Sequence, residues 1–216
     1  MTSSTKNERK IEHELAWIVG FALVLVLIFL GTQQIIKWST QFDYEGLHFT
    51  KTKFDKLVLY HYYYTWTDAQ DRTLRYNLYL RNDPRQNTVP VENRPLILET
   101  RGVYIALNLS SDLEGCSDSN LAVGDLALFL KHNQFSVTSG ITDKALANEL
   151  NQEHVNCARR PGSEVIEIAR GEETIISGDK FCTKITVGPD CDIANAVEKF
   201  KIITVADARN RAQGLL

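Results

Sequence analysis

The sequence lacks the signatures of the common enzyme classes. It contains no G-x-S-x-G nucleophile elbow, no P-loop, no G-x-G-x-x-G dinucleotide-binding turn and no H-E-x-x-H zinc site. No two cysteines have the C-x-x-C spacing of a zinc ribbon or a thioredoxin-like pair, and the 5 histidines are widely scattered. The sequence therefore predicts no cofactor and no metal centre, and it offers no recognisable motif for catalysis.

The chain also lacks a basic region. It carries 24 Lys and Arg against 27 Asp and Glu, a formal net charge of −3, and its cations are dispersed. Nucleic-acid-binding proteins present clustered Lys and Arg to the phosphate backbone, so no nucleic acid is expected as a partner. Internal repeats and low-complexity segments are missing too, and the hydrophobic content of 44% is that of an ordinary globular domain.

One long apolar run does stand near the N-terminus. Residues 16–30 read AWIVGFALVLVLIFL without a charge, and Trp17 and Trp38 flank the extended apolar segment. In a helix, the segment from Trp17 to Trp38 spans about 32 Å, close to the ~30 Å hydrocarbon core of a bilayer. Indole rings favour the membrane interface. We therefore expect a transmembrane helix at residues 15–38, in contact with the lipid bilayer and with its two tryptophans at the interfaces.

The charges around this run predict its orientation. Three cations precede it, Lys6, Arg9 and Lys10, and only Lys37 follows it closely. By the positive-inside rule, residues 1–14 form a cytoplasmic tail and the C-terminal domain lies outside the cytoplasm. A cleaved signal peptide is the alternative, but the run ends without a small-x-small cleavage site. The expected location is therefore the cell membrane, as a single-pass protein.

All four cysteines follow the apolar run, at Cys116, Cys157, Cys182 and Cys191. An even number of cysteines outside the cytoplasm predicts two structural disulfides. Four cysteines allow three pairings. We favour Cys182–Cys191 with Cys116–Cys157, because the first pair closes a short loop between a strand and a helix. Buried free thiols are the alternative.

The rest of the chain predicts one α/β (or α+β) domain at residues 54–216, preceded by a juxtamembrane connector at residues 39–53. Residues 54–66 and 72–81 alternate as the strands of a hairpin. The first strand is apolar or aromatic on both faces, which predicts cover on both sides; a recognition surface is the alternative. Further strands are expected at 96–99, 103–109, 135–137, 165–169, 174–177 and 181–187, and helices at about 118–132, 143–152 and from 192 onward. Together they predict a mixed sheet with about three helices.

One stretch carries a resemblance. Residues 76–85 (YNLYLRNDPR), followed by residues 89–92 (VPVE), resemble a motif of archaeal single-span membrane-anchored proteins that have no assigned activity. The spaced cysteines and the segment Cys191-Asp192-Ile193 fit the same family. The resemblance implies a membrane-anchored domain of an archaeal cell envelope, and it implies no chemistry.

Few residues remain as candidates for modification or metal binding. Asn108-Leu109-Ser110 is a sequon, so Asn108 is a candidate glycosylation site. Four oxygen-bearing residues follow it and resemble the ligands of a calcium site, namely Asp112, Glu114, Asp118 and Asn120. Their spacing is not that of an EF-hand, and helix capping is the simpler interpretation.

These observations lead to three functional hypotheses. The first is a membrane-tethered, non-enzymatic binding or structural module of the cell envelope. The second is an extracytoplasmic hydrolase whose polar residues, such as His61, Asp83 and Glu99, converge only in the fold. The third is an accessory subunit of a membrane protein complex, in which the helix or the domain contacts other envelope proteins.

Overall fold

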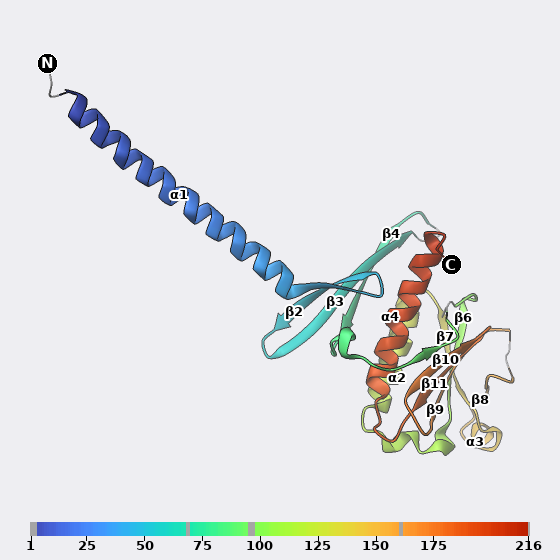
Figure 1. Ribbon diagram of the computed structural model, residues 1–216. Helices are drawn as coiled ribbons and strands as arrows, with labels where there is room; N and C mark the ends of the chain where they lie inside the picture. Colours follow the sequence, from blue (N-terminus) through green and yellow to red (C-terminus); the bar gives the residue numbers. More distant parts are fainter. Residues whose placement is uncertain (1–3, 68–69, 95–97, 160–161, 216) are drawn as a thin grey trace. The chain divides into compact units, whose positions relative to one another are not determined.

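The computed structural model describes residues 4–67, 70–94, 98–159 and 162–215, with side chains described from Trp17 onward. The chain divides into two compact units, Met1–Phe42 and Asp43–Leu216. The first unit is a single long helix with the beginning of a strand, and the second is a domain of mixed α/β content (Figure 1).

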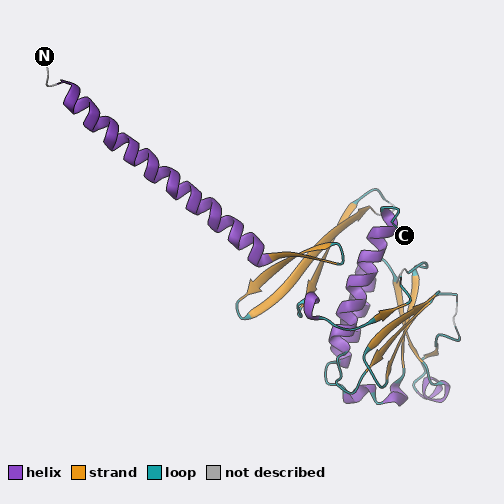
Figure 2. Ribbon diagram, viewed as in Figure 1, coloured by secondary structure: helices purple, strands orange, loops and turns teal. Residues whose placement is uncertain are grey.

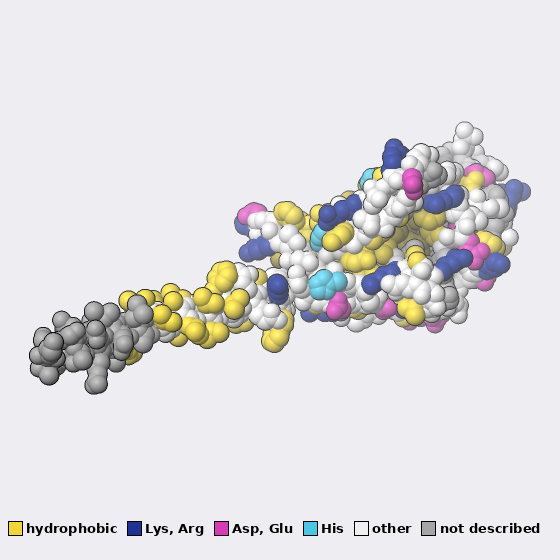
Figure 3. Space-filling view, turned by 90° about the horizontal axis from the view of Figure 1, so that it is seen from above, with side chains coloured by type: hydrophobic (Ala, Val, Ile, Leu, Met, Phe, Trp, Pro, Cys, Tyr) yellow, Lys and Arg dark blue, Asp and Glu magenta, His cyan; other side chains and the backbone are white. Residues whose placement is uncertain are grey.

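The first unit is built on helix α1, Ser4–Thr40. Its segment Trp17–Thr40 has a mean hydropathy of 2.2 and is long and apolar enough to cross a membrane. No part of the apolar window is buried in the protein, and Trp17 and Trp38 are 71% and 77% exposed. Figure 3 shows hydrophobic side chains along this segment. An apolar helix without protein cover fits membrane anchoring, and it extends beyond the predicted residues 15–38 at both ends.

The second unit contains a four-stranded sheet in the order β1-β2-β3-β4. Its strands are β1 Gln41–Tyr44, β2 Leu47–Phe54, β3 Leu57–Thr67 and β4 Thr73–Leu80. Strand β3 pairs antiparallel with β4, which confirms the predicted hairpin. Residues 39–53, expected as a connector, instead contain β1 and most of β2. The turn between these strands places Glu45 and Gly46 at φ 50° and 72°, a two-residue hairpin loop for which glycine is suited.

A second sheet has seven strands in the order β5-β10-β11-β9-β6-β7-β8. Strands β6, β7, β8, β9 and β11 run parallel, β10 runs antiparallel to β11, and β5 pairs in parallel with β10. The mixed sheet is therefore confirmed. The bounds are β5 Val91–Glu92, β6 Gly102–Leu107, β7 Ser136–Ile141, β8 Glu153–His154, β9 Glu164–Arg170, β10 Ile175–Asp179 and β11 Cys182–Val187. The predicted strand at 96–99 lies partly outside the described residues.

Three α-helices accompany the sheets, as predicted. They are α2 Ser119–His132, α3 Lys144–Glu149 and α4 Ile193–Ala212. Single turns of 3-10 helix occur at η1 Pro84–Gln86, η2 Leu109–Ser111 and η3 Leu113–Gly115. Figures 1 and 2 show α4 between the two sheets, and it contacts both of them.

Helix α4 is buried on all sides between residues 196 and 207. Its β-branched run, residues 202–205, is helical because this packing overrides the weak helix propensity of such residues. Buried charges require partners, and each charged side chain in this stretch has one. Glu198 accepts from the backbone of Arg81 and Asn82, Lys199 donates to the Tyr44 hydroxyl, Lys201 pairs with Asp125 and Asp207 pairs with Arg94.

Two disulfides link segments of the second unit. They join Cys116 to Cys191 and Cys157 to Cys182, with Cα–Cα distances of 5.3 Å and 5.6 Å. All four cysteines are therefore paired, but the favoured pairing was wrong. Strand β11 begins at Cys182 and ends before Cys191. The ends of a strand of this length lie roughly 17 Å apart, and the turn in which the Cys191 N–H donates to the Gly188 carbonyl keeps Cys191 near the end opposite Cys182.

Candidate functional site

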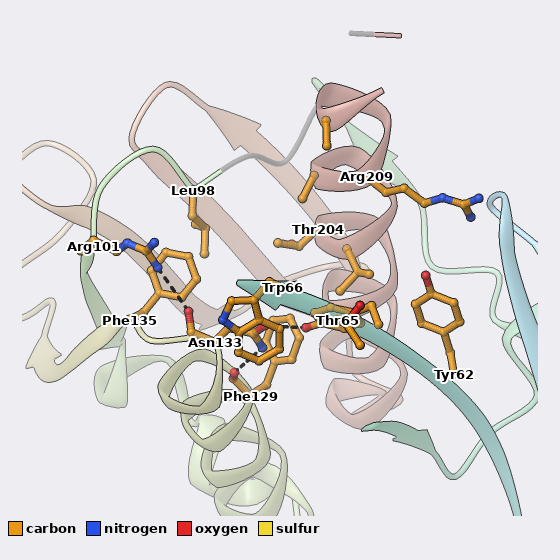
Figure 4. A pocket seen from close by; sticks show the side chains of 14 residues that line it. Tyr62, Thr65, Trp66, Leu98, Arg101, Phe129, Asn133, Phe135, Thr204 and Arg209 are labelled. Atoms are coloured by element: carbon orange, nitrogen blue, oxygen red, sulfur yellow. Dashed lines mark hydrogen bonds between the residues drawn. The ribbon is translucent and has the colours of Figure 1, made fainter. Parts of the chain in front are cut away.

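An apolar cavity of about 460 Å³ opens between β3, the C-terminal end of α2 and α4 (Figure 4). We call it the aromatic cavity. Its size falls in the range of roughly 300–1,000 Å³ that is typical of small-molecule sites. Five aromatic side chains line it, and α4 contributes small ones on the facing wall: Tyr62, Tyr64, Trp66, Phe129 and Phe135, with Ala208 and Ala212 opposite.

The alternation of β3 positions three of these rings. Tyr62, Tyr64 and Trp66 stand at every second residue and therefore share one face of the strand. Their ring centroids follow one another at 6.0 Å and 5.7 Å. Because Ala208 and Ala212 of α4 also line the space, large rings meet small side chains and a cavity remains between the elements.

Two polar side chains of the cavity wall are bonded to each other. The Tyr64 hydroxyl donates to Oδ1 of Asn133 at 2.6 Å, and Nδ2 of Asn133 donates to the carbonyl of Phe129 at 2.8 Å. Burial raises the pKa of Tyr64 far above its ordinary value, so this hydroxyl stays neutral. Tyr64 and Asn133 thus form a fixed polar link between β3 and the end of α2.

Thr204 carries a buried hydroxyl without a partner in the described part of the chain. This residue of α4 lines the cavity and is only 9% exposed. Its Oγ1 is buried and has no hydrogen-bond partner among the described residues. Buried hydroxyls in folded proteins are normally hydrogen-bonded, so this unpaired one is an unusual feature of α4 next to the cavity.

Two cations lie at the cavity, and the described residues that line it include no acid. The Arg101 guanidinium lies 5.8 Å from the ring centre of Phe135 and donates to the carbonyl of Asn133 at 3.5 Å. Arg209 donates to the carbonyl of Gly46, and Figure 4 shows its side chain directed away from Arg101. The charged residues at the cavity are therefore both cations, in a chain whose net charge is −3.

The cavity wall offers binding groups and little for catalysis. Its described residues include no His, Asp, Glu, Cys or Lys, the usual general bases and nucleophiles. The hydroxyls present belong to two tyrosines and two threonines, and the burial that raises the pKa of Tyr62 and Tyr64 makes both poor proton donors. The arrangement is suited to holding an apolar ligand with one or two polar contacts.

The polar residues suggested for a hydrolase do not meet. His61 lies on β3 with Nε2 at 3.0 Å from Oδ1 of Asn77. Asp83 pairs with Arg85 at 2.6 Å, and this contact lowers the pKa of Asp83. In the described part of the chain, His61, Asp83 and Glu99 bond to other residues and not to one another, and none of the three lines the aromatic cavity.

The prediction that β3 is covered on both sides was wrong. The face opposite the aromatic cavity carries His61 and Tyr63, and Tyr63 is 53% exposed. The rings on this face pack against one another: His61 stacks on Tyr79 at 4.6 Å, and the Arg75 guanidinium lies 3.9 Å from the centre of Tyr63. Cross-strand contacts of this kind stabilise a sheet, because each ring covers part of the next.

The other candidates lie around the end of β6. Asn108 is half-buried, and its carbonyl accepts hydrogen bonds from Ser111 in η2. Its glycosylation remains a prediction. Asp112 is exposed and lies 3.8 Å from Arg170. Among the described residues, no group of three or more His, Cys, Asp or Glu side chains is arranged to hold a metal ion.

The motif at residues 76–85 has a structural role. The carboxylate of Glu198 accepts from the backbone N–H groups of Arg81 and Asn82 at 2.6 Å and 3.3 Å, which joins the end of β4 to α4. The Asp83 side chain then accepts from the backbone N–H of Arg85 and caps η1. Burial raises the pKa of Glu198.

No protein-family model, no curated protein and no solved structure matches the chain. Sequence reasoning missed the aromatic cavity because Asn133, Phe135 and Thr204 come from separate elements. The signal that was available is the run of aromatics at every second position of β3, combined with the alanines near the end of α4.

Proposed function

We propose that the protein is a membrane-tethered binding module whose aromatic cavity holds a small apolar ligand. One observation carries the proposal: an apolar space of about 460 Å³ is lined by five aromatic side chains, and the described residues around it include no acid. Such a cavity with few polar groups is the usual form of a ligand site.

The energetics favour occupation. Apolar surface in contact with water is unfavourable by roughly 25 cal/mol per Å² relative to burial. An apolar ligand removes this surface from water at the rings of Tyr62, Trp66 and Phe135 without displacing the Tyr64–Asn133 hydrogen bond. The wall is also held in place, because α4 is anchored by the paired charges of its buried stretch and by the Cys116–Cys191 disulfide next to its start.

A binding role is better supported than hydrolysis. The described wall of the cavity has no general base, and the three residues considered for a hydrolase do not converge. The extracytoplasmic location belongs to the same proposal: it is supported by the disulfides, by the cations that precede the apolar run of α1 and by the resemblance of residues 76–85 to archaeal envelope proteins.

A role as an accessory subunit of a membrane complex is the second candidate. Leu57, Leu121 and Leu128 are each more than half exposed and border another groove, of about 550 Å³. Clusters of exposed apolar side chains mark protein interfaces. A protein partner that co-purifies in stoichiometric amount, and is lost on Leu121→Asp with Leu128→Asp, would favour this role.

The main proposal is tested by filling the aromatic cavity. Ala208 lines the cavity, so Ala208→Phe places a ring where the ligand would lie. Ala145→Phe is the matched control, because Ala145 is an exposed alanine of α3 away from the cavity. The assay is binding of a neutral, environment-sensitive naphthalene probe to the full chain held in lipid nanodiscs.

Wild type and Ala145→Phe are expected to bind one equivalent more of the probe than Ala208→Phe. Probe bound to lipid or to other apolar patches is the same for all three proteins and cancels in the comparison. Equal binding by all three would show that the aromatic cavity is not a ligand site.

A further inference from the structure

We infer that the ligand of the aromatic cavity is a single-chain anionic amphiphile from the membrane, with its hydrocarbon chain among the rings and its acidic headgroup on Arg101. This inference rests on the proposed function and names the ligand class. It is drawn from the charges at the cavity, from the rings that line it and from the small number of polar groups in its wall.

The charges favour an anion. Arg101 and Arg209 are the charged residues that line the cavity in the described part of the chain, and both are cations. Arg101 has five N–H donors, and the hydrogen bond described for it, to the Asn133 carbonyl, is long at 3.5 Å. Its planar guanidinium is suited to a two-pronged contact with a carboxylate or a phosphate.

The same cations disfavour the main alternative. Five aromatic side chains around one space resemble an aromatic cage for a quaternary ammonium ion. The guanidinium of Arg101 already lies 5.8 Å from the ring centre of Phe135. A second cation would be repelled by this charge and by Arg209, so the ring faces are available to hydrocarbon rather than to an ammonium group.

The hydrogen bonds disfavour a sugar or another polyhydroxylated ligand. Tyr64 and Asn133 are bonded to each other and Asn133 also to the Phe129 carbonyl. The rest of the wall is mostly ring and aliphatic surface, with few donors such as Arg101 and the Tyr62 hydroxyl. A ligand with many hydroxyls would bury most of them without partners. A ligand with one polar end and an apolar chain places its chain against the rings and its polar end on Arg101, which lies beside Phe135 in Figure 4.

The test uses Trp66 as the reporter, because this ring lines the cavity. The chain has 3 tryptophans, so Trp17→Phe with Trp38→Phe leaves Trp66 as the single one. This full-length variant is placed in nanodiscs of zwitterionic lipid and titrated with three probes that share a chain length: dodecanoate, dodecanol and dodecyltrimethylammonium.

Dodecanoate is expected to shift Trp66 emission at the lowest concentration, dodecanol at about tenfold higher concentration, and the ammonium probe at the highest. Arg101→Gln removes the headgroup contact, so the concentration of dodecanoate needed to shift the emission should rise to that of dodecanol. The concentration of dodecanol needed should not change in this variant. Arg209→Gln is the matched control, since it removes the same charge from a side chain that is engaged with Gly46.

Each outcome has one meaning. Equal binding of dodecanoate and dodecanol, or an unchanged preference in Arg101→Gln, overturns the anionic headgroup and leaves the aromatic cavity as a site for neutral ligands. An equal loss in both arginine variants overturns the assignment to Arg101. Tighter binding of the ammonium probe overturns the charge argument. No emission change with any probe, together with equal naphthalene binding by Ala208→Phe, overturns the proposed function itself.

Discussion

Replacing Thr204 by valine tests the most unusual feature of the cavity wall. Thr204 is 9% exposed, and its Oγ1 has no hydrogen-bond partner among the described residues. Valine has the same shape as threonine, with a methyl group in place of the hydroxyl. Both residues are β-branched and have similar helix propensities, so the exchange leaves the backbone of α4 largely unaffected.

The expected effect follows from the cost of burying an unpaired polar group. That cost is about 1–3 kcal/mol, and valine removes it. Thr204→Val should therefore raise the free energy of unfolding by at least about 1 kcal/mol, the lower end of that range. For a domain of this size, that corresponds to a rise in Tm of roughly 2–4 °C.

Thermal unfolding of the full chain in nanodiscs, followed by near-ultraviolet circular dichroism with both disulfides intact, measures the change. Thr204→Ser is the matched control: it keeps the hydroxyl and loses the methyl group, so its Tm should fall. If Thr204→Val lowered Tm by 2 °C or more, the hydroxyl would have a favourable partner in the folded protein, and our account of it as a buried group without a partner would be refuted.

The remaining predictions concern the frame around the cavity. Replacing both cysteines of a disulfide by serine should lower the free energy of unfolding by about 3.5 kcal/mol for Cys157–Cys182 and by about 4.5 kcal/mol for Cys116–Cys191. The two values differ because the disulfides close loops of different length, with separations of 25 and 75 residues. Denaturant unfolding of the two variants tests this order. Glu198→Ala should lower the free energy of unfolding by about 1–3 kcal/mol, since two backbone N–H groups lose their acceptor. Glu198→Gln should lower it less, because the glutamine side chain keeps one acceptor oxygen. Burial raises the pKa of Glu198 in the folded state, so its ionisation opposes folding. Stability should therefore increase as pH falls through this raised pKa toward the ordinary value for Glu, and the Gln variant should lack that increase.

Features of the fold that depend on local pattern were predictable. The uncharged run before residue 31 indicated the apolar helix, and the alternation around Leu74 and Leu78 indicated the hairpin of β3 and β4. Helix α2 followed from its apolar spacing. These features depend on residues that are close in sequence, and their hydrophobic periodicity is visible without knowledge of the tertiary contacts.

The missed features depend on distant contacts. The disulfide pairing could not be read from spacing, because β11 separates two cysteines that are close in sequence. The all-round burial of α4 was hidden by its charges, whose partners lie as far away in sequence as Arg94 and Asp125. The cavity has the same origin, since its walls come from four separate segments.

The short strands β1 and β2 were missed for another reason. Their signal was present in the turn at Glu45 and Gly46 and in the alternation of buried Leu47 and Phe49 with exposed His48. The proximity of the apolar helix suggested a connector, although the pattern itself is that of a hairpin.

The central claim is that the aromatic cavity holds a membrane-derived ligand. The most direct test purifies the full chain from native membranes in mild detergent, as wild type, Ala208→Phe and Ala145→Phe, and identifies by mass spectrometry the small molecules that remain bound. The account predicts an anionic, single-chain amphiphile in near-stoichiometric amount with wild type and Ala145→Phe, and its loss from Ala208→Phe. The same amount of ligand on all three proteins, or no ligand on any of them, would contradict it.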